Sequence, residues 1–196
     1  MNLEKTIHSL ESRGFRVSHF ADPAEAAAYI AASISGKTVG IGGSKTIEAL
    51  GLYEMLLADN TVYWHWKTPG RDTLKNAALA DVDLSGANAI SEDGEIFNID
   101  GTGNRLAGTL FGHEKVWITA GTNKIAPDFD TALKRARNEA AVKNCARFGK
   151  KTPCQLDGAC HDCRSGERIC RALTVLWGPM NGMETEVVLI DGEYGF

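Results

Sequence analysis

The five cysteines of the chain all lie in one short segment, between Cys145 and Cys170. Cys154, Cys160, Cys163 and Cys170 follow the spacing Cys-x5-Cys-x2-Cys-x6-Cys, and the central Cys-x2-Cys pair can bind one metal ion from a tight turn. Four thiolates suit tetrahedral zinc or an iron–sulfur cluster. The spacing therefore predicts a zinc or iron–sulfur site with these four cysteines as ligands.

Other chemistries fit the same segment. Basic residues surround the cysteines and would lower the pKa of the thiols, which favours an anionic thiolate site. These residues are Lys150, Lys151, Arg164, Arg168 and Arg171. His161 could replace one thiolate as a ligand. A redox pair, disulfides formed in oxidised protein, and buried thiols without a metal are the alternatives.

A second group of candidate residues lies where a predicted strand ends in a glycine-containing turn. This first turn contains Gly42, Gly43, Ser44 and Lys45, directly after the stretch KTVGI. Glycines let the backbone approach a ligand, and a helix that begins at Ser44 presents unpaired N–H groups that can bind a phosphate. The turn has neither P-loop spacing nor a full dinucleotide fingerprint. A tight strand-to-helix turn that binds nothing is the alternative.

Two further turns carry similar polar side chains. The second turn contains Asp100, Gly101, Thr102, Gly103, Asn104 and Arg105, and the third contains Asn123 and Lys124. An arginine at such a turn can bind phosphate or carboxylate through two hydrogen bonds, although Asp100 and Arg105 could instead only pair and cap. Because ligands of open α/β sheets bind at the carboxyl ends of the strands, we expect the three turns to converge on one sheet edge.

Predicted strands and helices alternate along most of the chain. Helices are expected over residues 3–12, from Asp22, from Ser44, and over 71–80 and 127–143. Strands are expected over residues 15–20, 37–41, 61–66, 81–90, 95–100, 115–121, 172–177 and 183–190. The alternation predicts an α/β fold with a doubly wound, mainly parallel sheet. We expect a single domain over residues 1–196, with the Cys-rich segment, residues 145–171, inserted before the last strands.

The composition is that of an ordinary globular protein and excludes several function classes. The chain has 196 residues, of which 43% are hydrophobic and 23% charged, and its net charge is −4. This charge gives no reason to expect nucleic acid or an anionic membrane as a partner. The N-terminal residues are charged throughout and lack the pattern of a signal peptide. We therefore expect a cytoplasmic protein, in which thiols stay reduced.

Several long blocks of the sequence resemble the LUD, or lactate-utilisation, domain family. The resemblance begins near Gly40 and is carried by NAISEDGEIFNIDGTGNRLAG, VWITAGTNKI, ALKRARNEAAVKNCARFGKKTPCQLDGACHDCRSGERIC and VVLIDGEYGF. It implies the α/β sheet of the NagB/RpiA/CoA-transferase-like superfamily. It also implies a role in the use of lactate or related organic acids. Characterised relatives act in bacterial L-lactate oxidation, some alongside iron–sulfur partner subunits, so such a partner is a further expectation.

The stretch SEDG, residues 91–94, is similar to the SENG motif that carries the glutamate nucleophile of CoA-transferases. The resemblance places Glu92 at the nucleophile position, and a desolvated carboxylate can attack an acyl-CoA. Asp93 replaces the asparagine of the motif, and its charge would disfavour an incoming carboxylate. A β-hairpin turn is the alternative, because EDG between two strands is typical of hairpins.

Three hypotheses follow from the sequence. The first is a LUD-domain protein that binds a small anionic metabolite or a phosphate-bearing ligand at the glycine turns. The second is an electron-transfer or assembly subunit, whose cysteines hold an iron–sulfur cluster or zinc. The third is a CoA-transferase-like enzyme that uses Glu92. The reaction and the oligomeric state, a homodimer included, stay open.

Overall fold

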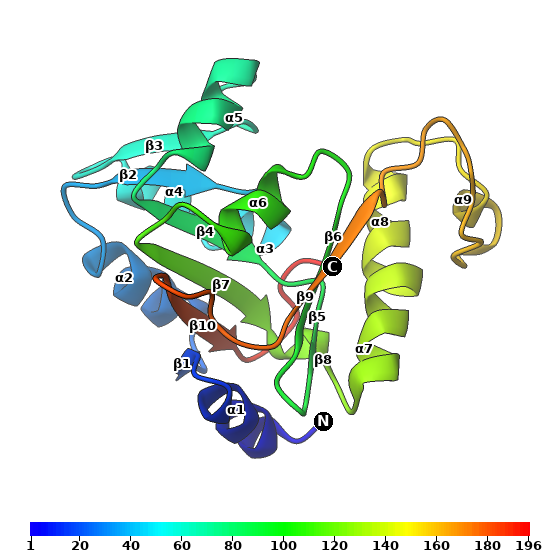
Figure 1. The fold of residues 1–196 in the computed structure, drawn as a ribbon, viewed down its shortest axis with the longest axis horizontal. Coiled ribbons are helices and arrows are strands. Elements are labelled where there is room, and N and C mark those ends of the chain that lie inside the picture. Colours follow the sequence, from blue (N-terminus) through cyan, green and yellow to red (C-terminus); the bar gives the residue numbers. More distant parts are fainter.

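Six parallel strands form the main sheet of the computed structural model, which describes residues 1–196 (Figure 1). These strands are β1 (Arg16–Phe20), β2 (Thr38–Ile41), β3 (Thr61–Trp64), β4 (Val82–Gly86), β7 (Lys115–Gly121) and β10 (Glu184–Ile190). Their order is β1-β10-β7-β4-β2-β3, and every neighbouring pair is parallel. The predicted α/β fold with a mainly parallel sheet is confirmed.

A second, four-stranded sheet was not expected. It contains β5 (Ala89–Ser91), β6 (Ile96–Asp100), β8 (Ile125–Ala126) and β9 (Ala172–Leu176) in the order β8-β5-β6-β9. The single strand predicted over residues 81–90 is wrong, because the chain leaves the main sheet after Gly86. Asn88 donates its backbone N–H to Phe97 O at 2.9 Å, so the chain pairs with β6 instead of continuing β4.

Helices connect the strands, and four of them begin at a residue whose side chain caps the first turn. They are α1 (Leu3–Ser12), α2 (Pro23–Ala32), α3 (Lys45–Ala49), α4 (Leu52–Leu56), α5 (Arg71–Ala78), α6 (Asn104–Leu110), α7 (Phe129–Arg135), α8 (Ala141–Arg147) and α9 (Cys154–Asp157). A 3-10 turn, η1, covers Thr122–Lys124, and a π-helical segment, η2 (Ala136–Ala140), joins α7 to α8. The four capped helices are α1, α2, α3 and α7, and in the first three Asn2, Asp22 and Ser44 accept hydrogen bonds from the first turn.

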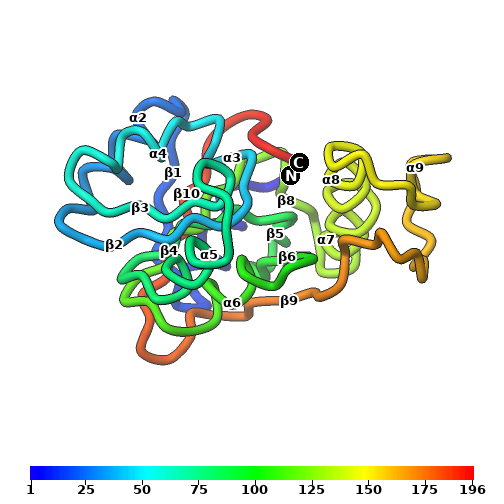
Figure 2. The backbone as a smooth tube through the Cα atoms, turned by 90° about the horizontal axis from the view of Figure 1, so that it is seen from above, coloured from blue at the N-terminus to red at the C-terminus, as the bar shows by residue number.

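The elements stack in layers around three hydrophobic clusters. Side chains of α2, α3 and α4, such as Ile30, Ile47 and Leu52, pack on one face of the main sheet. On the other face lie α1 and one side of the small sheet. The small sheet packs its remaining side, which includes Phe97, against α7 and η2. Figure 2 shows α7, α8 and the outermost α9 beyond the small sheet.

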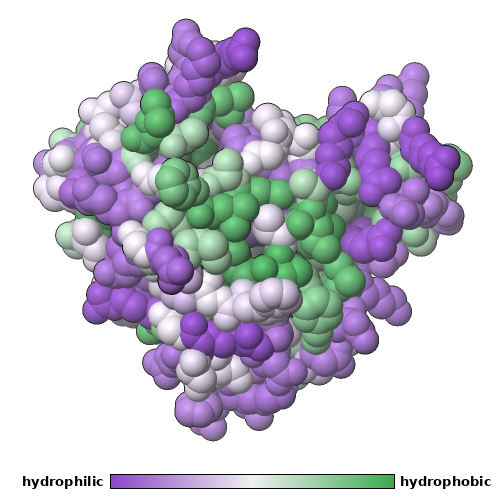
Figure 3. All heavy atoms as spheres, viewed as in Figure 1, coloured by the Kyte–Doolittle hydropathy of each residue, from purple (hydrophilic) through white to green (hydrophobic).

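Hydrophobic side chains also gather on one exposed face, across α6 and β9 (Figure 3). Phe111, which follows α6, is 85% exposed, and Leu173 of β9 is 44% exposed. Phe97 on the neighbouring strand β6 is fully buried. Phe111 is therefore a suitable exposed control for a substitution at the buried Phe97.

Phe97→Ala should lower the free energy of unfolding by about 3–5 kcal/mol, because it removes a fully buried ring from the small-sheet cluster. The ring also stacks edge-on against Phe129 of α7, with centroids 4.9 Å apart. Urea denaturation measures the change. Phe111→Ala is the control and should change the value by less than about 0.5 kcal/mol. Equal effects of the two substitutions would contradict the packing of α7 on the small sheet.

Candidate functional site

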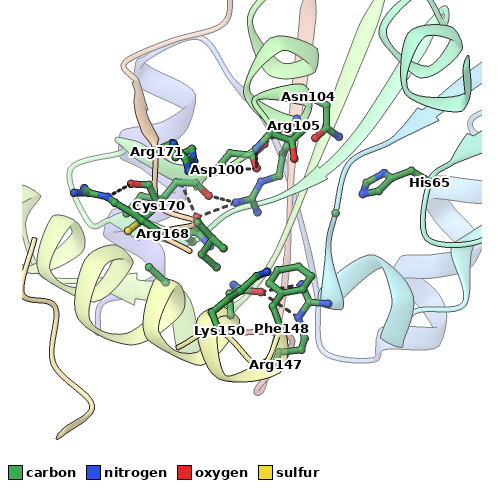
Figure 4. Close-up of a pocket in the computed structure, with 18 of the residues that line it drawn as sticks. His65, Asp100, Asn104, Arg105, Arg147, Phe148, Lys150, Arg168, Cys170 and Arg171 are labelled. Carbon is green, nitrogen blue, oxygen red and sulfur yellow. Dashed lines mark hydrogen bonds between the residues drawn. The ribbon is translucent and has the colours of Figure 1, made fainter. Parts of the chain in front are cut away.

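A cleft of about 350 Å³ opens where the ends of several parallel strands face α8 (Figure 4). Its walls come from Gly43 and Trp66 after β2 and β3, and from residues within three stretches: 100–105 after β6, 144–150 at the end of α8, and 168–171 before β9. Binding sites for small molecules commonly have volumes of about 300–1,000 Å³. The cleft is therefore large enough for a small metabolite.

Cationic side chains dominate the cleft. They are Arg105, Arg147, Lys150, Arg168 and Arg171, and Figure 4 shows them on several sides of the cleft. Arg168 pairs with Asp162 at 2.9 Å, whereas the other four have no carboxylate within ion-pair distance. The only acidic residue of the lining is Asp100. An excess of unpaired cations in a cavity favours an anionic ligand.

The Asp100 carboxylate accepts hydrogen bonds from backbone N–H groups of its own turn. One carboxylate oxygen, Oδ1, accepts the N–H groups of Gly101 at 2.6 Å and Thr102 at 3.3 Å, and Oδ2 accepts that of Arg105 at 3.1 Å. The carboxylate therefore shapes the turn after β6 and the start of α6. No salt bridge forms between Asp100 and the Arg105 guanidinium. Of the expected pairing and capping by Asp100, the structure therefore shows only the capping.

Arg105 points back from α6 toward the two sheets. Its Nη2 donates to Asn88 Oδ1 at 3.0 Å and to Ile99 O at 2.5 Å. Nε and Nη1 make no hydrogen bond within the protein and are free for a ligand. Burial lowers the pKa of Arg105, although an arginine remains charged. A Cβ at Gly42 would lie 3.1 Å from Arg105 Cγ, so a larger residue there would require the arginine side chain to shift by a few tenths of an ångström.

An inner chamber of about 20 Å³ adjoins the cleft at the ends of β2, β4 and β7. It shares with the cleft the residues Gly43, Trp66, Asn88, Arg105 and Asn144. Lys124, only 3% exposed, also lines the chamber and donates to Thr46 Oγ1 at 2.9 Å. Burial, with the nearby charges of Arg135 and Arg105, lowers the pKa of Lys124 to about 7.

The structure brings most of the sequence-predicted turn residues together. Gly43, Ser44, Lys45, Asp100, Gly101, Thr102, Asn104, Arg105 and Lys124 line the cleft or the chamber. Gly42, Gly103 and Asn123 do not, and Asn123 instead donates its N–H to Gly192 O at 3.3 Å. Ser44 caps α3, which has only five residues and thus a weak dipole, and Lys45 pairs with Glu48. The three turns meet at the cleft and the chamber, but the expectation of one shared sheet edge is wrong, because the second turn follows β6 of the small sheet whereas the other two follow β2 and β7 of the main sheet.

Sequence reasoning missed the wall that α8 contributes. Arg147 stacks on Trp66, with its guanidinium carbon 4.7 Å from the ring centroid, and its Nη2 donates to Asn144 Oδ1 at 3.1 Å. This contact joins the end of α8 to the end of β3. Lys150 was noted only as a neighbour of the cysteines, and Asn88 was placed inside a strand. The glycine in SGAN before Asn88 was the available signal for a turn.

All five cysteines line one small cavity of about 20 Å³ between α8 and the segment that carries α9. They are free thiols, and burial raises the pKa of Cys145. Arg137 Nη2 lies 3.6 Å from Cys160 Sγ. No group of three or more histidine, cysteine or acidic side chains is arranged to hold a metal ion. Metal binding by Cys154, Cys160, Cys163 and Cys170 thus stays a prediction.

Glu92 lies in the turn of the β5–β6 hairpin, outside the lining of both the cleft and the chamber. Its Oε1 accepts the N–H of Asn2 at 2.7 Å, and the Lys5 ammonium lies 3.9 Å from Oε2. Gly94 completes the turn with a φ of 86°. The placement matches the hairpin alternative and ties the turn to α1; a nucleophilic role for Glu92 stays a prediction.

The family model of the LUD domain matches residues 3–190. The chain belongs to the LUD domain family. A crystal structure of a DUF162 family protein from Deinococcus radiodurans resembles this LUD domain with a TM-score of 0.55 at 17% identity, over 98% of this chain and 99% of the other. No curated protein matches the sequence. The predicted family and fold are confirmed, and the family associates the chain with lactate utilisation.

None of the helices has both the length and the apolar character that crossing a bilayer requires.

Asp83 of β4 gives the stability of the fold a measurable pH dependence. Its carboxyl is 4% exposed with one oxygen unpartnered, and burial raises its pKa to about 8 although Arg105 opposes the shift. An unfolded aspartate has a pKa of about 3.9. The free energy of unfolding is therefore highest below pH about 4, where the carboxyl is protonated in both states. It falls as the pH rises toward 8, because the unfolded carboxyl ionises while the folded one stays protonated. Asp83→Asn should remove this loss.

Urea denaturation at pH 5 and pH 8 tests this expectation. Asp83→Asn should gain stability relative to the wild type at the higher pH, by at most about 1.4 kcal/mol per pH unit. Asp72→Asn, at an exposed carboxylate of α5, is the control and should follow the wild type at both values. Parallel pH profiles for Asp83→Asn and the wild type would contradict a neutral Asp83.

Proposed function

We propose that this LUD domain binds a small anionic metabolite, bearing a carboxylate or phosphate, in the cleft, within the use of lactate or a related organic acid. The observation that carries the proposal is the set of four cations without carboxylate partners around one cavity. Anions bound by arginine in a partly dry site gain charge-assisted hydrogen bonds, each stronger than a neutral one. The cleft supplies such donors from three separate elements.

The shape of the cleft supports a ligand with an apolar or planar part. Trp66 and Phe148 both line the cleft, and Arg147 contacts both rings. Burial lowers the pKa of His65, which keeps its imidazole neutral at pH 7. A neutral imidazole and two aromatic rings can contact carbon atoms of the ligand while the cations hold its charge.

Substitution of the cleft cations should weaken anion binding in a graded way. Arg105→Ala should raise the Kd for a phosphate- or carboxylate-bearing probe by about 10–100-fold, since a hydrogen bond to a charged group contributes about 1.5–3 kcal/mol. Arg171→Ala, at the exposed rim, should raise it by less than about 10-fold. Calorimetry with inorganic phosphate, ribose 5-phosphate, lactate and pyruvate measures these constants.

The matched control is Arg164→Ala, which removes an exposed charge outside the cleft lining. It should leave every Kd unchanged, and binding to the wild type should weaken as salt rises. Because Arg105 also holds Asn88 and Ile99, melting temperatures identify any loss caused by unfolding. Equal Kd values for Arg105→Ala, Arg171→Ala and the wild type would remove the cleft as the anion site.

A second candidate function is that the thiol cavity holds zinc or an iron–sulfur cluster, and that the chain transfers electrons or docks on an iron–sulfur partner. One specific observation favours it: five cysteines spread over residues 145–170 all face the same cavity. Arg137 and Arg168 line that cavity too, and their charges favour thiolates. Coordination of one ion would bring at least three sulfur atoms within about 2.3 Å of it.

Protein purified without oxygen should contain about one zinc or a cluster's complement of iron per chain, measured by elemental analysis and visible absorption. Cys160→Ser and Cys163→Ser should each lose the metal, because they remove half of the predicted Cys-x2-Cys pair. Cys145→Ser, outside the predicted set of ligands, is the control and should retain it. Metal-free wild-type protein from anaerobic cells would contradict metal binding at the thiol cavity.

A further inference from the structure

The inner chamber is lined by a buried primary amine, that of Lys124. Lys124 is held by η1 at the end of β7, and its Nζ has one hydrogen-bond partner, Thr46 Oγ1. Thr46 Oγ1 donates its own hydrogen to Tyr194 O at 3.0 Å, so it accepts from the amine. None of the groups that shift the Lys124 pKa is a carboxylate; the charged ones are Arg105 and Arg135. Lys124 therefore has no carboxylate side chain as an ion-pair partner.

We propose that Lys124 is a nucleophile that forms an imine with the carbonyl carbon of a 2-oxo acid whose carboxylate is bound by Arg105. The inference rests on the proposed anion-binding function of the cleft and adds a covalent step to it. Buried lysines beside other cations supply neutral amines that attack carbonyl groups. The burial of Lys124 and its two arginine neighbours match that environment.

The size of the chamber selects the class of ligand. Arg105 and Lys124 line the same space of about 20 Å³, which is little more than the volume that one water molecule requires. The chamber therefore admits one small group, while Arg105, which also lines the cleft, can hold a carboxylate on the cleft side. A carbonyl that reaches Lys124 must then be attached directly to that carboxylate. A 2-oxo acid has its carboxylate directly attached to the carbonyl carbon. A sugar phosphate separates its anionic group from its carbonyl by several bonds and does not fit this placement.

The step needs no further reactant. The lone pair of Nζ forms a bond to the carbonyl carbon, and the oxygen becomes the hydroxyl of a carbinolamine. Loss of that hydroxyl with the proton from nitrogen releases one water molecule and leaves a C=N bond. Phe196 lines the chamber, and a Cβ at the neighbouring Gly195 would lie 3.1 Å from Nζ.

Reductive trapping of the full chain tests the proposal. Wild-type protein with pyruvate and borohydride should gain the mass of pyruvic acid less one oxygen atom, at Lys124 in the peptide map. The initial rate should rise with pH and level off above about pH 7, because only the neutral amine attacks. Ribose 5-phosphate should give no adduct at Lys124. Lys124→Arg should lose the label, and Lys134→Arg, at an exposed lysine of α7, should keep it.

The outcomes separate this inference from the proposed function. If calorimetry shows that pyruvate binds but no adduct maps to Lys124, the imine is wrong and the anion site stands. If pyruvate neither binds nor labels while another of the four probes binds in the cleft, the imine is wrong and the anion site stands; if none of the four probes binds, both proposals fall. Labelling spread over exposed lysines, with a rate still rising to pH 10, overturns the assignment of Lys124. Should Lys124→Arg fail to fold, the peptide map and the rate profile of the wild type still decide.

Discussion

The hydrogen bonds of Asn88 determine where the two sheets meet, and the cleft depends on that junction. Its backbone N–H donates to Phe97 O and to Asn98 Oδ1, and its Oδ1 accepts from Ile99 N at 2.7 Å and from Arg105 Nη2 at 3.0 Å. Its carbonyl oxygen accepts from Arg135 Nη1. One 4% exposed residue thus connects β4, β6, α6 and α7. A buried amide with these partners satisfied is a strong local constraint.

This junction also concentrates positive charge in a partly dry space. Arg105 and Arg135 both bond to Asn88, and Lys124 lies close enough for their charges to lower its pKa. Burial of an unpaired charge is unfavourable, so the pKa of a buried titratable group shifts to favour its neutral form. Lys124 shifts toward the neutral amine and Asp83 toward the neutral acid, while the arginines stay charged. The proposed anionic ligand would supply the missing counter-charge and would therefore change the pKa values of these groups on binding.

Much of the main sheet was predictable because its signals are local. Residues 3–12 form the expected helix, Ser44 caps α3 as its type suggested, and the strand 115–121 has the predicted bounds. The small sheet was not predictable, since β5 has three residues and β8 has two, and both depend on distant partners. The same distinction holds in the site: glycine turns at strand ends were visible in the sequence, whereas the packing of Arg147 on Trp66 was not.

The π-helical segment η2 is one reason why the contribution of α8 to the cleft was not predictable from the sequence. A π turn contains an extra residue, which rotates the following helix by roughly 100° relative to a regular α-helix of 3.6 residues per turn. The segment Ala136–Ala140 therefore decides which side chains of α8 face the cleft and which face the thiol cavity. Asn144 and Arg147 turn to the cleft, and Cys145 turns to the thiols. Cys170 lines both spaces, so the thiol cavity and the proposed anion site share a wall.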